Sequence, residues 1–93
     1  MGKKKILVAD DEFYVRDTVK GALEEDYIVL EASDGEEAIS IARNQKPSLI
    51  LMDILLPNLD GISACCILKS DANTKAIPIV MISGRIANMN FPF

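Results

Sequence analysis

Ile6-Leu7-Val8-Ala9-Asp10-Asp11 is a short apolar run that stops abruptly at two carboxylates. A continuous run of this length, without polar alternation, is typical of a strand that is buried on both faces of a parallel sheet. The pattern recurs at Leu49 to Met52, which ends at Asp53, and at Ile77 to Ile82, which ends at Ser83. These three runs therefore predict strands whose carboxyl ends carry polar side chains.

A further strand and three helices are predicted between these runs. The segment from 27 to 30 is β-branched and aromatic, as strands prefer. Apolar residues recur at helical spacing from 12 to about 24, from about 35 to 45 and from 62 to 70. The alternation of strand and helix with short connections predicts an α/β fold, in which right-handed βαβ units form a parallel sheet. Candidate capping carboxylates precede the three helices at Asp11, Asp34 and Asp60.

The third predicted helix has an unusual composition. Its apolar residues go almost all the way round, which predicts packing on more than one side. Its neighbouring cysteines, Cys65 and Cys66, cannot form a framework of long-range disulfides, and the chain has no His to complete a zinc site. We interpret the two cysteines as small core residues, with a redox role as the alternative.

Length and composition predict one soluble domain over residues 1–93, with an irregular tail at 84–93. The longest apolar runs are far shorter than the roughly 18–20 residues that cross a bilayer, so no membrane contact is expected. The net charge of −4 opposes non-specific nucleic-acid binding. The basic run Lys3-Lys4-Lys5 is followed by too short an apolar stretch for a signal peptide, which favours the cytoplasm.

Polar residues at the strand ends indicate a site for phosphorus chemistry. In parallel sheets ligands gather outside the carboxyl ends of the strands. If the first and third strands are neighbours, the carboxylates of Asp10, Asp11 and Asp53 converge at one edge and repel one another unless a cation is present. Oxygen ligands without His or Cys favour Mg²⁺. Beside that ion Asp53 could attack phosphorus and form an acyl phosphate. Ser83 could donate its hydroxyl to the new phosphoryl group, and Gly84 would allow close backbone approach.

Three separated segments share a family pattern. They read ILVADDE at 6–12, LMDILLPNLDG at 51–61 and IPIVMISG at 77–84. In order and spacing they resemble the receiver domain of two-component response regulators. The resemblance implies a flavodoxin-like, doubly wound parallel sheet. In this chain it would be incomplete, with four strands in the order 2-1-3-4, three helices and no fifth β/α repeat.

The resemblance also implies a role for each site residue. Asp53 would be the phosphoacceptor, in a Mg²⁺-dependent reaction with a phosphohistidine on a sensor histidine kinase or phosphotransfer protein. Asp11 would bind the metal directly, Asp10 through water, and Leu55 through its backbone carbonyl. Ser83 would be the switch residue that moves towards the phosphoryl group. The chain would be a signalling domain rather than an enzyme.

The sequence departs from the family pattern after residue 84. The family's lysine after a fifth strand is missing, and Phe91 stands where that lysine would be in Phe91-Pro92-Phe93. We expect the open side of the fourth strand to pair with another chain, giving a homodimer or higher oligomer.

Two other functional classes are compatible with an acidic strand end. A phosphohydrolase of the haloacid dehalogenase type also uses an aspartate nucleophile with Mg²⁺, but it needs a second aspartate where this chain has Leu55. A degenerate receiver would act only as a module for protein interaction or dimerisation. Modification of Asp53 by a small phosphodonor would distinguish a working phosphoacceptor from that module.

Overall fold

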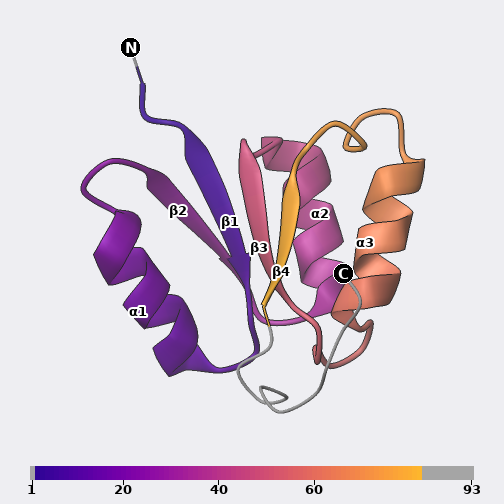
Figure 1. Ribbon diagram of the computed structural model, residues 1–93, viewed down its shortest axis with the longest axis horizontal. Helices are drawn as coiled ribbons and strands as arrows, with labels where there is room; N and C mark the ends of the chain where they lie inside the picture. The colour runs from indigo at the N-terminus through magenta and orange to yellow at the C-terminus, as the bar shows by residue number, and fades with distance from the viewer. Residues whose placement is uncertain (1, 83–93) are drawn as a thin grey trace.

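The computed structural model describes residues 2–82, in which strands and helices alternate (Figure 1). The predicted strands and helices are confirmed. The last strand begins two residues later than predicted, because Pro78 has no N–H to donate to the sheet. Ser83, Gly84 and the predicted irregular tail at 84–93 lie outside the described residues. The elements are β1 (Lys5–Ala9), α1 (Phe13–Leu23), β2 (Ile28–Ala32), α2 (Gly35–Gln45), β3 (Leu49–Asp53), α3 (Gly61–Ser70) and β4 (Ile79–Ile82).

The strands form one parallel sheet in the order β2-β1-β3-β4, which confirms the expected topology. Ala9, the last residue of β1, is in register with Ala32 of β2 and with Met52 of β3. The carboxyl ends of the three strands therefore lie level with one another. The residue that follows Ala9 and the residue that follows Met52 consequently come to the same edge of the sheet.

The helices lie on both faces of the sheet (Figure 1). Helix α1 packs beside β2 and β1 on one face, whereas α2 and α3 pack against each other on the opposite face. The main core lies beneath α2 and α3, where alternate residues of the central strands β1 and β3 are apolar and buried. Helix α1 has no buried residue. The fully buried side chains of this core include Leu7, Ile50, Met52 and Leu68.

Helix α3 buries one face only, so the prediction that it packs on several sides is wrong. Its buried residues are Gly61, Ala64 and Leu68, which form a single stripe towards α2 and the sheet. Ile62 and Ile67 are exposed. The prediction that the cysteines are core residues is also wrong, because Cys66 is exposed and Cys65 only half-buried.

Two of the three predicted helix caps are confirmed. The carboxylate of Asp34 accepts the backbone N–H of Glu37 at 2.8 Å, and that of Asp60 accepts the N–H of Ser63 at 2.8 Å. The prediction for Asp11 is wrong, because α1 begins one residue later, with Glu12 in the cap position and no side-chain cap bond.

Candidate functional site

Three consecutive acidic residues form a compact group at the end of β1. Carboxylate oxygens of Asp10, Asp11 and Glu12 all lie within 4.8 Å of one another. Asp10 is buried, Glu12 is half-buried and Asp11 is exposed. Glu12 was not among the residues predicted for the site, because its position suggested only the start of a helix. The run of three acidic letters is the signal that could have indicated it.

Asp53 reaches the same edge of the sheet from β3. It follows Met52, which is in register with Ala9, just as Asp10 follows Ala9 on the neighbouring strand. Its side chain is almost completely buried, with 3% exposed, and accepts the backbone N–H of Leu55 at 3.3 Å. The fold thus places the predicted residues Asp10 and Asp11 in the compact group and Asp53 at the same edge of the sheet, outside that group.

The electrostatics of this edge are unfavourable to carboxylate charge. Burial raises the pKa of Asp10 above its ordinary value, and the N–H of Glu12, which donates to Asp10 at 2.9 Å, partly opposes that rise. The carboxylates of Asp53 and Asp11 raise the pKa of Asp10 further. The site is therefore one in which a bound cation would relieve repulsion between neighbouring negative charges.

The loop that follows Asp53 is closed by a hydrogen bond between its two ends and is bound to the start of α2 through Asn58. Gly61 donates its N–H to the carbonyl of Ile54 at 2.9 Å, and a Cβ at Gly61 would collide with the carbonyl oxygen of Asp53. Asn58, whose φ of 66° is left-handed, donates its side-chain amide to the carboxylate of Asp34 at 2.9 Å. Asn58 is thereby held at the start of α2, and the start of α3 lies against the backbone of Asp53.

The donor atoms at this edge fit a hard divalent cation. The compact group offers only carboxylate oxygens, the chain contains no His, and its two cysteines lie on α3 outside the group. Mg²⁺ prefers oxygen ligands of this kind and binds through one or two carboxylates while keeping several waters. Leu55, the predicted source of a carbonyl ligand, has an exposed side chain and stands two residues after Asp53.

A protein-family model for the response regulator receiver domain matches residues 6–91. The chain belongs to this family. It is a receiver domain of two-component signalling, and its four described strands and three described helices are those of the family's fold. This membership argues against the phosphohydrolase alternative.

Several curated proteins are similar to this receiver domain. The alkaline phosphatase synthesis transcriptional regulatory protein PhoP of Bacillus subtilis is 43% identical over 83 residues, which cover 88% of this chain and 34% of that protein. Protein PilH of Pseudomonas aeruginosa is 36% identical over 80 residues, which cover 85% of this chain and 66% of PilH. Histidine kinase P4 of Formosa agariphila is matched over only 6% of its length. The chain thus spans a minor part of several of these relatives.

Solved structures of receiver domains have the same fold. The receiver domain of the sensor histidine kinase PA1611 from Pseudomonas aeruginosa, with a magnesium ion coordinated in its active-site cleft, gives a TM-score of 0.81 at 31% identity. The N-terminal domain of a response regulator receiver protein from Methanoculleus marisnigri gives 0.81 at 32% identity. Each comparison covers 86% of this chain and 66% of the other.

Within residues 2–82 the helices are too short or too polar to cross a membrane.

Proposed function

We propose that this receiver domain accepts a phosphoryl group on Asp53 from a phosphohistidine of a sensor histidine kinase or a phosphotransfer protein. The observation that carries the proposal is the position of Asp53. Its carboxylate lies at the end of β3, beside Asp10 and the acidic group at the end of β1. The carboxyl ends of the strands meet at this edge of the sheet, which is rich in carboxylate oxygens that can bind a metal ion. A buried carboxylate in such a place is suited to act as a nucleophile on phosphorus.

The proposed transfer forms one bond and breaks one. A carboxylate oxygen of Asp53 attacks phosphorus, the bond between phosphorus and the donor's imidazole nitrogen breaks, and its electron pair remains on that nitrogen. The product is an acyl phosphate on Asp53. The backbone N–H of Leu55, 3.3 Å from Asp53 Oδ1, helps to orient the attacking carboxylate. The chain acts here as a phosphoacceptor signalling domain and turns over no separate substrate.

We assign the metal site to the same edge of the sheet. Asp10, Asp11 and Asp53, with the Leu55 backbone carbonyl, are the proposed ligand set, and Glu12 is near enough to contribute. When bound, Mg²⁺ neutralises charge on the transferring group and orients it for in-line attack. The magnesium ion in the PA1611 receiver domain, a structural relative, supports this assignment.

Two residues after β4 complete the proposed site. Ile82 is in register with Asp53, and Ser83 and Gly84 follow it in the sequence. We assign the hydroxyl of Ser83 to hydrogen bonding with the phosphoryl group, as the switch residue. Gly84 provides a residue without a side chain, so that the backbone can approach the phosphoryl group.

The surface beside the acidic group supports a protein as phosphodonor. Phe13 and Tyr14, at the start of α1, are 67% and 66% exposed, and Leu55 and Ile62 are also exposed. Exposed aromatic residues next to a buried nucleophile are suited to hold a partner protein while its phosphohistidine reaches Asp53. A small phosphodonor does not need contacts with this surface. The exposed side chains therefore affect the choice of partner protein rather than the chemistry of phosphoryl transfer.

The proposal is tested by incubating the protein with Mg²⁺ and acetyl phosphate and measuring its intact mass. We expect the mass to increase by one phosphoryl group, with the modification on Asp53. The increase should be lost in Asp53→Asn and when Mg²⁺ is removed by chelation. Asp17→Asn, which removes a carboxylate of α1 outside the acidic group, is the matched control and should be phosphorylated normally. A folded protein that stays unmodified would overturn the proposal and favour the interaction module.

We further propose that the chain forms a homodimer or higher oligomer through the β4 side of the sheet. In the described part of the chain β4 pairs with β3 alone, and Val80 on it is 48% exposed. An edge strand with an exposed apolar residue is a surface on which a second chain can pair.

We also propose that the protein lies in the cytoplasm. Both cysteines are free, which favours the cytoplasm because disulfides are rare there.

A further inference from the structure

Arg16 of α1 makes contacts that link three elements around the acidic group. Its Nη1 donates to the backbone carbonyl oxygen of Asp10 at 2.7 Å, and its Nε donates to Glu31 of β2 at 3.1 Å. Its guanidinium also lies 5.8 Å from the centre of the Phe13 ring. The side chains of Arg16 and Glu31 are 16% and 33% exposed, so these contacts are partly shielded from water.

The carbonyl that Arg16 binds belongs to the peptide joining Asp10 to Asp11. The N–H on the other side of Asp10 donates to the carbonyl of Ala32 at 3.0 Å. The backbone of Asp10 is therefore held from both sides, by β2 through its N–H and by Arg16 through its carbonyl. Rotation of the peptide after Asp10 would move the whole of Asp11. The bond from Arg16 restricts that rotation.

We infer that Arg16, held in place by Glu31, is a positioning residue that fixes the direction of the Asp10–Asp11 peptide and thereby sets the geometry of the proposed metal site. This inference rests on the proposed function. The guanidinium is suited to the task, because its planar fork can donate to a carbonyl and a carboxylate at the same time, which a lysine ammonium cannot do with the same geometry. Groups one step removed from a metal's ligands affect metal affinity in this way.

Removal of Arg16 should change the affinity for Mg²⁺ in the direction opposite to that expected from charge alone. Arg16 is a positive charge close to a site for a positive ion, so removing that charge should by itself strengthen Mg²⁺ binding. If the position of the Asp10–Asp11 peptide matters more, removing Arg16 should weaken binding. The direction of the change in Mg²⁺ dissociation constant therefore distinguishes a positioning role from a merely electrostatic one.

Calorimetric titration of the full chain with MgCl₂ tests the inference. We expect Arg16→Gln to weaken Mg²⁺ binding by about tenfold. Arg16→Lys keeps the charge but should also weaken binding, because its ammonium cannot bridge both acceptors. Glu31→Ala should weaken binding similarly, and the double variant should lose little more than Arg16→Gln alone, since the two residues act as one unit. Far-UV circular dichroism without Mg²⁺ confirms that each variant is folded.

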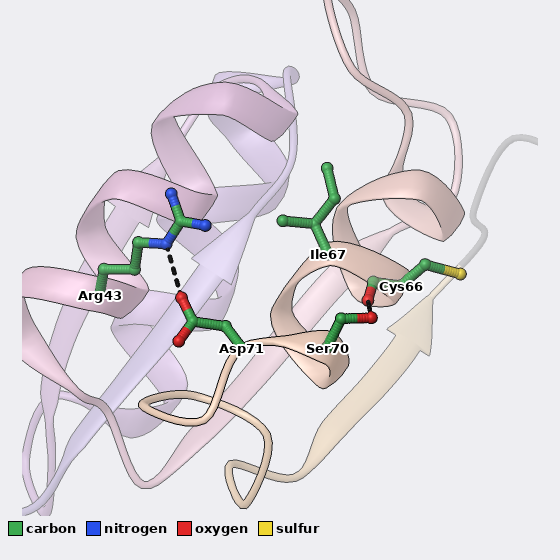
Figure 2. A pocket seen from close by; sticks show the side chains of 5 residues that line it. All are labelled: Arg43, Cys66, Ile67, Ser70 and Asp71. Atoms are coloured by element: carbon green, nitrogen blue, oxygen red, sulfur yellow. Dashed lines mark hydrogen bonds and ion pairs between the residues drawn. The ribbon is translucent and has the colours of Figure 1, made fainter.

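The matched control is Arg43→Gln. Arg43, in the last turn of α2, makes a comparable ion pair with Asp71 at 2.9 Å, beside Cys66, Ile67 and Ser70 (Figure 2). Its removal changes the net charge equally but leaves the Asp10 peptide untouched, so Mg²⁺ affinity should stay close to that of the wild type.

Three results would overturn the inference. Unchanged or tighter Mg²⁺ binding by Arg16→Gln would show that Arg16 does not position the site. Equal losses in Arg16→Gln and Arg43→Gln would show a general effect of charge or stability. If the wild-type protein binds no Mg²⁺, the proposed function fails together with the inference, whereas normal binding by wild type and Arg16→Gln alike refutes the inference alone.

Discussion

Gly61, the first residue of α3, lies directly against the backbone of Asp53. A Cβ at Gly61 would meet the carbonyl oxygen of Asp53, and the N–H of Gly61 donates to the carbonyl of Ile54 at 2.9 Å. The start of one helix is therefore packed on the peptide that carries the proposed phosphoacceptor. Any side chain at position 61 must displace that peptide.

Replacement of Gly61 by Ala should consequently damage both stability and phosphorylation. We expect the free energy of unfolding to fall by about 1–3 kcal/mol, as overpacked sites usually show. The rate of modification by acetyl phosphate should also fall, because the carboxylate of Asp53 shifts with its backbone. Urea denaturation and intact-mass kinetics measure the two effects.

Gly21 provides the control for this substitution. It lies within α1, and a Cβ there would meet none of the described residues within 4 Å beyond the backbone of its own helix. Gly21→Ala should therefore stabilise the protein by about 0.5–1 kcal/mol through helix propensity and leave phosphorylation unchanged. Equal behaviour of the two alanine variants would contradict the proposed contact between α3 and Asp53.

Removal of the Asp10 charge should have opposite effects on the metal-free and metal-bound protein. Burial, together with the nearby carboxylates of Asp53 and Asp11, raises the pKa of Asp10, which means that its ionised form is unfavourable in the fold. Asp10→Asn should therefore raise the melting temperature at neutral pH without Mg²⁺. Scanning calorimetry in the presence of a chelator measures this change.

The same variant should lose the stabilisation that Mg²⁺ gives to the wild type. At a Mg²⁺ concentration tenfold above its dissociation constant, the wild-type protein should gain about 1.4 kcal/mol of unfolding free energy. Asp10→Asn should gain much less. A variant that is less stable than wild type without Mg²⁺, or equally stabilised by it, would contradict the assignment of Asp10 to a strained metal site.

The sequence was sufficient to predict the strands and helices and their order along the chain, because each element depends on local patterns. Apolar runs predicted the strands, and Asp34 and Asp60 were recognised as caps since the bonds they make span only three residues. Glu12 was missed because its place in the acidic group depends on a turn, in which Asp10 accepts the N–H of Glu12. Its approach to the other carboxylates could not be derived from periodicity.

Features that depend on side-chain contacts between elements were not accessible from the sequence. The pairing of Arg16 with Glu31 requires β2 to lie beside β1, with α1 over both. Ile62 and Ile67 are likewise exposed because α2 is the one described helix against which α3 packs. The composition of α3 does not determine how many neighbours it has. The apolar composition of α3 predicted burial that its position in the fold does not provide.

The cap of α3 should make stability depend on acid pH. The backbone N–H and the hydroxyl of Ser63 both donate to Asp60, and they lower the pKa of Asp60 below its ordinary value of 3.8. A lowered pKa in the folded state means that the stabilisation is present above pH 3.8 and is lost as pH falls through the lower folded value. Asp60→Asn, which keeps a capping oxygen but cannot titrate, should reduce the slope of stability against pH below about pH 4. Urea denaturation over a series of acidic buffers measures the slope, and an identical slope in both proteins would contradict the assignment.

The two edges of the described sheet allow a direct test of association. Val80 on β4 and Ile28 on β2 are exposed to similar extents, 48% and 44%, on opposite edge strands. A lysine on an edge strand opposes pairing with another chain, because its charge would have to be buried. If copies associate through β4, Val80→Lys should shift the sedimentation coefficient to that of a monomer, whereas Ile28→Lys should leave the oligomer intact. Sedimentation velocity at several protein concentrations gives the answer. Wild-type protein that sediments as a stable monomer, or dissociation by Ile28→Lys alone, would show that β4 is not the surface of association.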